Sequence, residues 1–160
     1  MPETLDAMDL RLIAALQEDA RLSYRAIGRH VGLSQPAVAE RIRRLEEAGV
    51  ITGYRGRVDR SRAGLPVTAF LRVTCSGDRF QAVHRLARDL PAVLECHHVS
   101  GEACFMIKVA DATLAGLERT IERFREHGET VSSIVLSSVV EDKPVALGQA
   151  GGNGPSDALP

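Results

Sequence analysis

Hydrophobic residues in the first fifty positions recur at helical spacing in three separate segments. Each segment follows a polar residue, Asp6, Ser23 or Ser34, whose side chain can cap the start of a helix. Gly32 separates the second segment from the third, and Gly49 follows the third, where glycine commonly ends a helix. A helix, a short helix, a tight glycine turn and a capped helix are typical of a helix-turn-helix motif.

The third predicted helix has an apolar stripe and an arginine-rich surface beside it. Val38, Ile42 and Leu45 fall on one side, which predicts that they face the core. A helix with small residues near its start and guanidinium groups further along can enter the major groove of double-stranded DNA. The candidate DNA-binding residues are Ser34, Gln35, Pro36, Ala37, Glu40, Arg41, Arg43 and Arg44.

Residues 50–58 alternate loosely between apolar and polar positions and include β-branched side chains, which predicts a strand. We therefore expect residues 1–60 to form a winged-type helix-turn-helix domain that ends in a linker strand.

Strand and helix patterns alternate over the next ninety residues in the order strand, helix, strand, strand, helix, strand. This is the order of a ferredoxin-like βαββαβ sandwich, in which two helices cover one face of an antiparallel sheet. The strands are expected over residues 67–75, 93–100, 104–109 and 131–140. Asp78 is expected to cap the first helix, and Asp111 or Thr113 the second. The second helix should point four side chains inward, namely Leu114, Leu117, Ile121 and Phe124.

Neighbouring strand positions are apolar in pairs, so both faces of the expected sheet carry apolar side chains. The pairs are Phe70 with Leu71, Met106 with Ile107, and Val135 with Leu136. This pattern is typical of a sheet that is buried on both sides. Because the two helices cover only one face, the chain is expected to self-associate through the other.

The expected fold class is thus α+β, with a helix-turn-helix domain over residues 1–60 and a ferredoxin-like domain over 61–143. From residue 144 the sequence is rich in Gly, Pro, Ala, Ser and Asn without a period. Residues 144–160 are therefore predicted to be disordered.

Charge is divided unevenly along the 160 residues. The whole chain has a net charge of −1, but residues 21–62 contain ten arginines and four acidic residues, a net charge of +6. A basic segment of this kind favours nucleic acid as a partner, because guanidinium groups suit phosphates and guanine edges. The alternative is a solvated helix in which arginines pair with Glu40, Glu46 and Glu47.

The sequence favours a cytoplasmic protein that is not an enzyme. It contains no apolar run long enough for a membrane span and no secretion signal at its start. Three cysteines, an odd number without metal spacing, favour free buried thiols over a redox or metal role. We find no phosphate loop, nucleophile elbow or paired carboxylates, and adjacent His97 and His98 would point to opposite faces of a strand. No catalytic residue, metal ligand or cofactor is therefore predicted.

Several short motifs together resemble the Lrp/AsnC family of transcriptional regulators. They are Leu5–Asp9, Leu22–Ser23, Val31–Ser34 and Arg41–Ile51 in the first module, and Val99–Glu102 with Thr130–Leu136 in the second. The second module resembles the ligand-responsive RAM domain of that family. The resemblance implies a sequence-specific DNA-binding regulator that forms homodimers through the RAM sheets, usually assembled into octamers.

The resemblance also implies an effector, an amino acid or a related small molecule, bound between RAM domains. The matching positions are Gly101, Glu102, Cys104, Thr130 and Ser132. The family usually has an acid at the position of Cys104, and a neutral thiol cannot replace its charge toward an ammonium group. Glu102 would then take that role, the ligand would be less cationic, or there would be none.

Two other function classes stay open. Some haem-pathway decarboxylases resemble this architecture, but they would need a convergent basic and histidine pocket, which only His97 and His98 suggest. The third class is a metabolite-sensing module without DNA contact.

Overall fold

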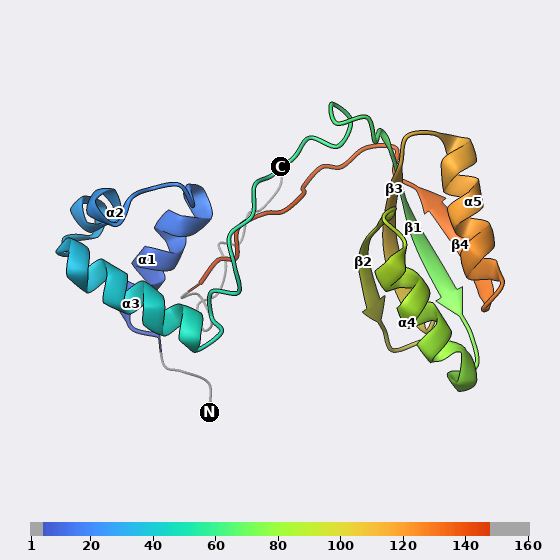
Figure 1. Cartoon of the computed structure of the whole chain (residues 1–160), viewed down its shortest axis with the longest axis horizontal. Coiled ribbons are helices and arrows are strands. Elements are labelled where there is room, and N and C mark those ends of the chain that lie inside the picture. The colour runs from blue at the N-terminus through green and yellow to red at the C-terminus, as the bar shows by residue number, and fades with distance from the viewer. Residues whose placement is uncertain (1–4, 148–160) are drawn as a thin grey trace, which may run out of the picture. The chain divides into compact units, whose positions relative to one another are not determined.

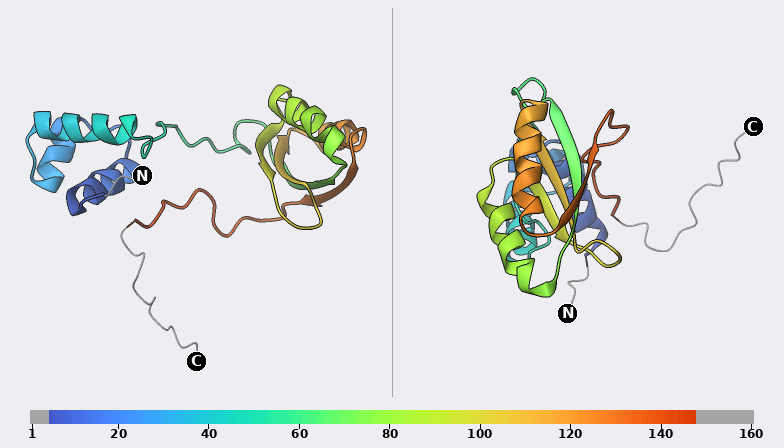
Figure 2. Two further views of the ribbon diagram at one scale, coloured as in Figure 1. Left: turned by 90° about the horizontal axis from the view of Figure 1, so that it is seen from below. Right: turned by 90° about the vertical axis from the view of Figure 1, so that its right-hand side faces the viewer.

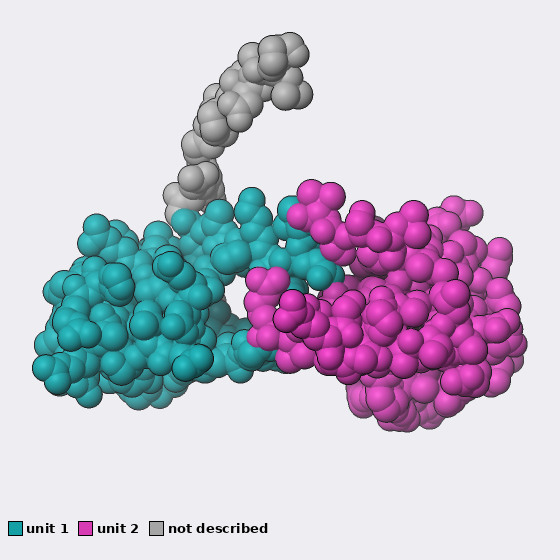
Figure 3. Space-filling model, turned by 90° about the horizontal axis from the view of Figure 1, so that it is seen from above, with its two compact units in different colours: residues 1–56, 140–160 teal, residues 57–139 magenta. Residues whose placement is uncertain are grey.

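The computed structural model describes residues 5–147, which belong to two compact units. One unit comprises Met1–Gly56 with Val140–Pro160, and the other comprises Arg57–Val139 (Figure 3). The expected domain limits at residues 60 and 143 stay predictions. Of the tail that was expected to be disordered, residues 148–160 lie outside the described part of the chain, and residues 144–147 contain no helix or strand.

The helices of the first unit form the predicted helix-turn-helix arrangement (Figure 1). Asp6, Ser23 and Ser34 are their N-caps, since each side chain accepts a hydrogen bond from a backbone N–H of the first turn. The capped helices are α1 (Ala7–Glu18), α2 (Tyr24–Val31) and α3 (Gln35–Glu47).

Two glycines allow the tight turn between α2 and α3. Gly32 has a φ of 79°, a left-handed conformation that glycine adopts without steric cost. Gly28 is buried in α2, and its carbonyl accepts hydrogen bonds from the N–H groups of Gly32 at 2.8 Å and Leu33 at 2.9 Å. A Cβ atom on Gly28 would lie 2.5 Å from the Leu33 carbonyl oxygen. The turn therefore packs directly onto the backbone of α2.

The apolar face of α3 faces the core as predicted. Val38, Ile42 and Leu45 are fully buried, and the first two pack with Leu12 of α1 and Ile27 of α2. One side of α3 is thereby fixed against the other helices.

None of residues 50–58, all of which the structure describes, is in a strand, so the expected strand is absent. A strand requires backbone hydrogen bonds to a neighbouring strand. The segment instead follows the end of α3: the N–H groups of Val50 and Ile51 donate to the Leu45 carbonyl, and the Tyr54 hydroxyl donates to Glu46 at 2.8 Å. Burial, and then the hydrogen bond to Glu46, raise the pKa of Tyr54 to about 12.

The second unit has the predicted ferredoxin-like order of elements. Its antiparallel sheet has the strand order β2-β3-β1-β4 among the described residues, and both helices cover the same face (Figure 2). The core between sheet and helices includes Leu71, Phe105, Ile107, Leu117 and Phe124. The elements are β1 (Val67–Thr74), α4 (Phe80–Asp89), β2 (Val93–His98), β3 (Phe105–Asp111), α5 (Leu114–Arg125) and β4 (Glu129–Ile134).

Three local expectations for this unit were wrong. Asp78 does not cap α4, because it lies inside a short 3-10 helix, Gly77–Arg79, that precedes it. Leu114 is 61% exposed, because it is the first residue of α5 and lies beyond the edge of the core. The last strand ends at Ile134 and does not reach residue 140. Thr113, one of the two expected residues, caps α5.

The second face of the sheet carries apolar side chains that no helix or strand among residues 5–147 covers. Phe70 and Val131 are 39% and 43% exposed, and Lys108 lies with its Nζ atom 6.0 Å from the centroid of the Phe70 ring. As expected, α4 and α5 cover only the face that carries Leu71 and Ile107, and burial of the other face by self-association stays a prediction. Leu136, which follows β4, is 95% exposed.

Candidate DNA-binding surface and effector region

The start and the outer side of α3 present the exposed members of the predicted DNA-binding set. Gln35, Pro36, Glu40, Arg43 and Arg44 are exposed, whereas Ala37 and Arg41 are half-buried. Ser34 is also exposed, but its hydroxyl accepts a hydrogen bond from the Ala37 N–H at 3.4 Å. Its role in this structure is thus to cap the helix.

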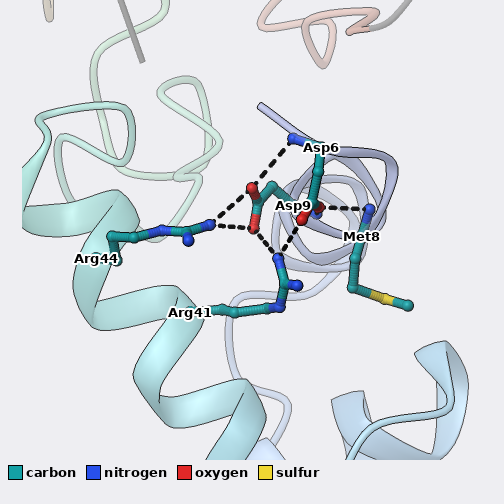
Figure 4. Close-up of polar contacts among 5 residues, drawn as sticks. All are labelled: Asp6, Met8, Asp9, Arg41 and Arg44. Atoms are coloured by element: carbon teal, nitrogen blue, oxygen red, sulfur yellow. Dashed lines mark hydrogen bonds and ion pairs between the residues drawn. The ribbon is translucent and has the colours of Figure 1, made fainter. Parts of the chain in front are cut away.

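Arg41 and Arg44 point from α3 toward the start of α1 (Figure 4). Arg41 Nη1 donates to Asp6 Oδ2 at 2.7 Å and to Asp9 Oδ1 at 2.8 Å. Arg44 Nη2 donates to both carboxylate oxygens of Asp9, at 2.8 and 2.9 Å. These two arginines therefore connect α3, the helix expected to enter DNA, to α1 of the same unit.

Asp9 is the centre of this connection and is only 1% exposed. Besides the two guanidinium groups, its carboxylate accepts a hydrogen bond from the Asp6 N–H at 3.2 Å, and the Asp6 carboxylate accepts one from the Asp9 N–H at 2.8 Å. This reciprocal pair is a capping box, in which two free N–H groups of the helix start are satisfied. The sequence predicted the cap at Asp6 but not the ion pairs of Asp9. A signal was present, because Asp9 lies three and four residues before the buried Leu12 and Ile13, on the face that turns inward.

The same contacts change the acidity of Asp6. The hydrogen bond from the Asp9 N–H, and then the one from Arg41, lower the pKa of Asp6 to about 2. Both hydrogen bonds stabilise the charged form of the Asp6 carboxylate, and this is why its pKa is lowered.

Arg43 makes the alternative contacts that the sequence left open. Its guanidinium group donates to Glu40 at 2.6 Å and also to Glu47, both on α3. The pKa of Glu40 is lowered by this hydrogen bond and by the charge of Arg43. All three side chains are more than half exposed, so this pairing is open to water and can exchange for another anion.

The candidate effector residues gather around the end of β1. The Cys104 N–H donates to the Val73 carbonyl at 2.9 Å, and Val73 is paired with Thr130 of β4. The Thr74 hydroxyl donates to the Glu102 carbonyl at 3.5 Å. The segments that contain Cys104 and Thr130 thus flank the end of β1, one on each side.

The remaining candidates occupy less central positions. Gly101, with a φ of 115°, forms the turn before β3, and Ser132 lies further along β4 opposite Leu71. Thr130 is buried, and its hydroxyl donates to the Gly128 carbonyl at 3.1 Å. Ser132, in contrast, is exposed. The structure therefore places Glu102 and Cys104 on the β3 side of the end of β1 and Thr130 on its β4 side, with Ser132 further along β4.

His97 and His98 do not form a joint site. His98 contacts the rings of Phe80 and Phe105 on the side of α4, whereas His97 lies 3.4 Å from the carboxylate of Glu95. Among the described residues no cluster of three His, Cys, Asp or Glu side chains could hold a metal ion. None of the described helices is long and apolar enough to cross a membrane.

Comparisons with known proteins agree with this geometry along both units. The AsnC-type helix-turn-helix domain matches residues 5–46, and the Lrp/AsnC ligand binding domain matches residues 68–145. The HTH-type transcriptional regulator LrpC of Bacillus subtilis is 34% identical over 135 residues, which cover 84% of this chain and 94% of that protein. The chain belongs to the Lrp/AsnC family of transcriptional regulators.

Solved structures of Lrp/AsnC proteins share the fold. The structure of Bacillus subtilis LrpC has a TM-score of 0.83 at 33% identity and covers 88% of this chain and 100% of its own. A transcriptional regulator of Neisseria meningitidis in complex with L-Met has a TM-score of 0.84 at 25% identity, covering 90% and 97%. In sequence, the leucine-responsive regulatory protein of Rhizobium meliloti is also 33% identical, over 86% of this chain and 92% of that protein. These relatives are transcriptional regulators and not enzymes, so the expected family, fold class and regulator function are confirmed.

Proposed function

We propose that this Lrp/AsnC regulator binds double-stranded DNA by placing α3 in the major groove. The observation that carries the proposal is the division of α3 into a fully buried face, with Val38 and Ile42, and an exposed face that starts at Gln35. Arg25 and Arg29 are exposed on the preceding helix α2 and add basic groups to the same unit. A fixed inner face and a free outer face are what a helix needs to enter a groove.

The eight candidate residues then have different roles. Gln35 offers an exposed amide at the start of α3, and such an amide can pair with an adenine edge. Arg43 exchanges its exposed carboxylate partners for a phosphate. Arg41 and Arg44 act mainly through Asp9, by holding α3 at a set position relative to α1.

We infer that an amino-acid effector binds in the region of Gly101, Glu102, Cys104, Thr130 and Ser132. The meeting of these segments around Val73 supports the assignment, as does the L-Met complex of the related Neisseria regulator. Backbone N–H groups of the hairpin turn suit the carboxylate of such a ligand, and the Glu102 carboxylate suits its ammonium group.

We further propose a homodimer formed through the uncovered face of the sheet, and octamers built from it. Phe70 and Val131 on that face support this assembly, because exposed apolar patches mark contact surfaces. A dimer would read two half-sites separated by about 34 Å, one turn of DNA, or a multiple of it. As a regulator of chromosomal DNA the protein would act in the cytoplasm, and we assign it no catalytic step.

The proposal is tested by substituting Arg43 and, as a control, Arg125, an arginine in a similar local setting outside the helix-turn-helix unit. Arg43 on α3 and Arg125 on α5 are both exposed and both pair with a glutamate three residues earlier. Arg43→Ala should weaken binding to all genomic DNA fragments alike and lower the salt dependence by about one phosphate contact. Arg125→Ala should leave binding unchanged. Equal affinity of wild type and Arg43→Ala, measured by fluorescence anisotropy at several salt concentrations, would contradict the role of Arg43.

A further inference from the structure

Two thiols meet where β1 ends and β3 begins. Cys75 directly follows β1, and Cys104 directly precedes β3. The Cys75 N–H donates to the Cys104 sulfur at 3.4 Å, and the Cys104 thiol donates to the Cys75 carbonyl at 3.1 Å. The sulfur of Cys104 therefore lies against the backbone of Cys75, and both residues are half-buried.

Cys75 also contacts the loop between α5 and β4. A Cβ atom on Gly128 would lie 2.8 Å from the Cys75 Cβ atom and 2.4 Å from the Thr74 carbonyl oxygen. Gly128 in turn accepts the hydrogen bond of the Thr130 hydroxyl. Cys75 is thus located between the two segments that contain the candidate effector residues, although it is not one of those candidates itself.

We propose that Cys75 and Cys104 are a redox-responsive thiol pair that closes to a disulfide when the protein meets a peroxide. This differs from the sequence-based expectation, which favoured free thiols without a redox role. The reason is spatial, because 28 residues separate the two cysteines in the sequence while the pairing of β1 with β3 brings them into contact.

The reaction needs hydrogen peroxide as the only co-reactant. The Cys104 thiolate attacks one peroxide oxygen, the O–O bond breaks, and sulfenic acid and hydroxide form. The Cys75 thiolate then attacks the Cys104 sulfur and displaces the sulfenic oxygen as hydroxide. With the two thiol protons the products are one disulfide and two waters, so two sulfurs are oxidised and one peroxide is reduced.

The surroundings of the cysteines decide their order in this reaction. Burial raises the pKa of the Cys75 thiol, and the neighbouring Cys104 thiol raises it further. Cys75 is therefore assigned the second, resolving step. Cys96 lies apart from this pair on β2, where burial raises the pKa of its thiol and its side chain packs against the core.

A bond between the two sulfurs would tie the end of β1 to the hairpin turn that contains Gly101 and Glu102. The bond would thereby restrain a turn that we propose contacts the effector, and this effect on effector binding rests on the proposed function. The bond itself does not, because it requires only a peroxide and the contact between the two cysteines.

The test is peptide mapping of the full-length wild-type protein after peroxide treatment, without reduction. Trypsin together with a protease that cleaves after Glu95 and Glu102 separates Cys96 from Cys104. The expected product is a cross-linked peptide that contains Cys75 and Cys104, an intact mass lower by two hydrogens, and reversal by dithiothreitol. Cys96→Ala should keep the link, whereas Cys75→Ser and Cys104→Ser should each lose it.

Three results would overturn the proposal: both thiols remaining free, a link that includes Cys96, or links between chains only. Failure of amino-acid binding, measured separately by calorimetry on the reduced protein, would contradict the proposed effector and leave the disulfide result unaffected. The two failures are therefore distinguishable.

Discussion

Both carboxylate oxygens of Asp9 accept hydrogen bonds from Arg44, across the contact between α1 and α3. Asp9 is 1% exposed, and a buried carboxylate is tolerated only when charged groups and hydrogen bonds compensate its lost hydration. Arg44, Arg41 and the Asp6 N–H supply that compensation. The start of the first helix therefore helps to set the position of the helix that we expect to enter DNA.

Asp9→Asn should destabilise the helix-turn-helix unit. The amide keeps the shape of the side chain but removes the charge that holds Arg41 and Arg44, and a hydrogen bond to a charged group contributes about 1.5–3 kcal/mol. We expect a loss of that size in the free energy of unfolding, measured by urea denaturation. Glu40→Gln is the matched control, because its ion pair with Arg43 is exposed to water, and it should unfold like wild type. Equal stability of Asp9→Asn and Glu40→Gln would disprove the role of Asp9.

Asp6 should make stability depend on pH in the acid range. Its pKa is lowered from 3.8 to about 2 in the folded protein, first by the hydrogen bond from the Asp9 N–H and then by Arg41. Because the folded pKa lies below the unfolded one, this stabilisation is present above about pH 4 and is lost as the pH falls toward 2. Asp6→Asn keeps an N-capping side chain but does not titrate. The melting temperature of wild type should thus fall more steeply between pH 4 and 2 than that of Asp6→Asn, and parallel curves would contradict the assignment.

Gly28→Ala should disturb the turn of the helix-turn-helix motif. The added Cβ atom would lie 2.5 Å from the Leu33 carbonyl oxygen, which belongs to the backbone and cannot rotate away. Overpacking of this kind costs about 1–3 kcal/mol. Gly56→Ala is the control, because nothing lies within 4 Å of a Cβ atom there. Thermal unfolding followed by circular dichroism should show a lower midpoint for Gly28→Ala alone.

Arg43→Ala and Arg44→Ala should distinguish an arginine that contacts DNA from one that holds α3 in position. Arg44 is bound to the buried Asp9, so its removal should lower both the melting temperature and the affinity for DNA. Arg43 is bound to exposed glutamates, so its removal should lower the affinity at unchanged melting temperature. Calorimetric melting and fluorescence anisotropy on the same samples give both quantities. If Arg44→Ala melts like wild type, the ion pair with Asp9 does not position α3.

Glu102→Gln should weaken an amino-acid effector without changing DNA binding in its absence. The substitution removes the carboxylate that we assign to the ligand ammonium, which corresponds to roughly a tenfold to hundredfold rise in the dissociation constant. Cys104→Asp should strengthen binding, since it would add a negative charge that can pair with the ligand ammonium group. Titration calorimetry with a panel of amino acids measures both changes. If wild type and both variants bind none of them, the amino-acid effector is excluded.

Local chemistry was sufficient to predict the helices of the first unit and the order of elements in the second. Capping residues such as Ser23 and Ser34, the turn glycine Gly32 and the spacing of Val38, Ile42 and Leu45 act within a few residues of the chain. The strand expected over residues 50–58 was wrong because a strand depends on a pairing partner that local pattern cannot supply.

The sequence by itself determined which residues form helices, which face of α3 is apolar and which family the motifs resemble, because these properties follow from spacing along the chain. Only the tertiary structure decided what the charged and reactive side chains contact. Folding brings Asp9 to Arg44 across 35 positions and Cys75 to Cys104 across 29. Such contacts arise from the packing of whole elements, so periodicity within one element carries no information about them.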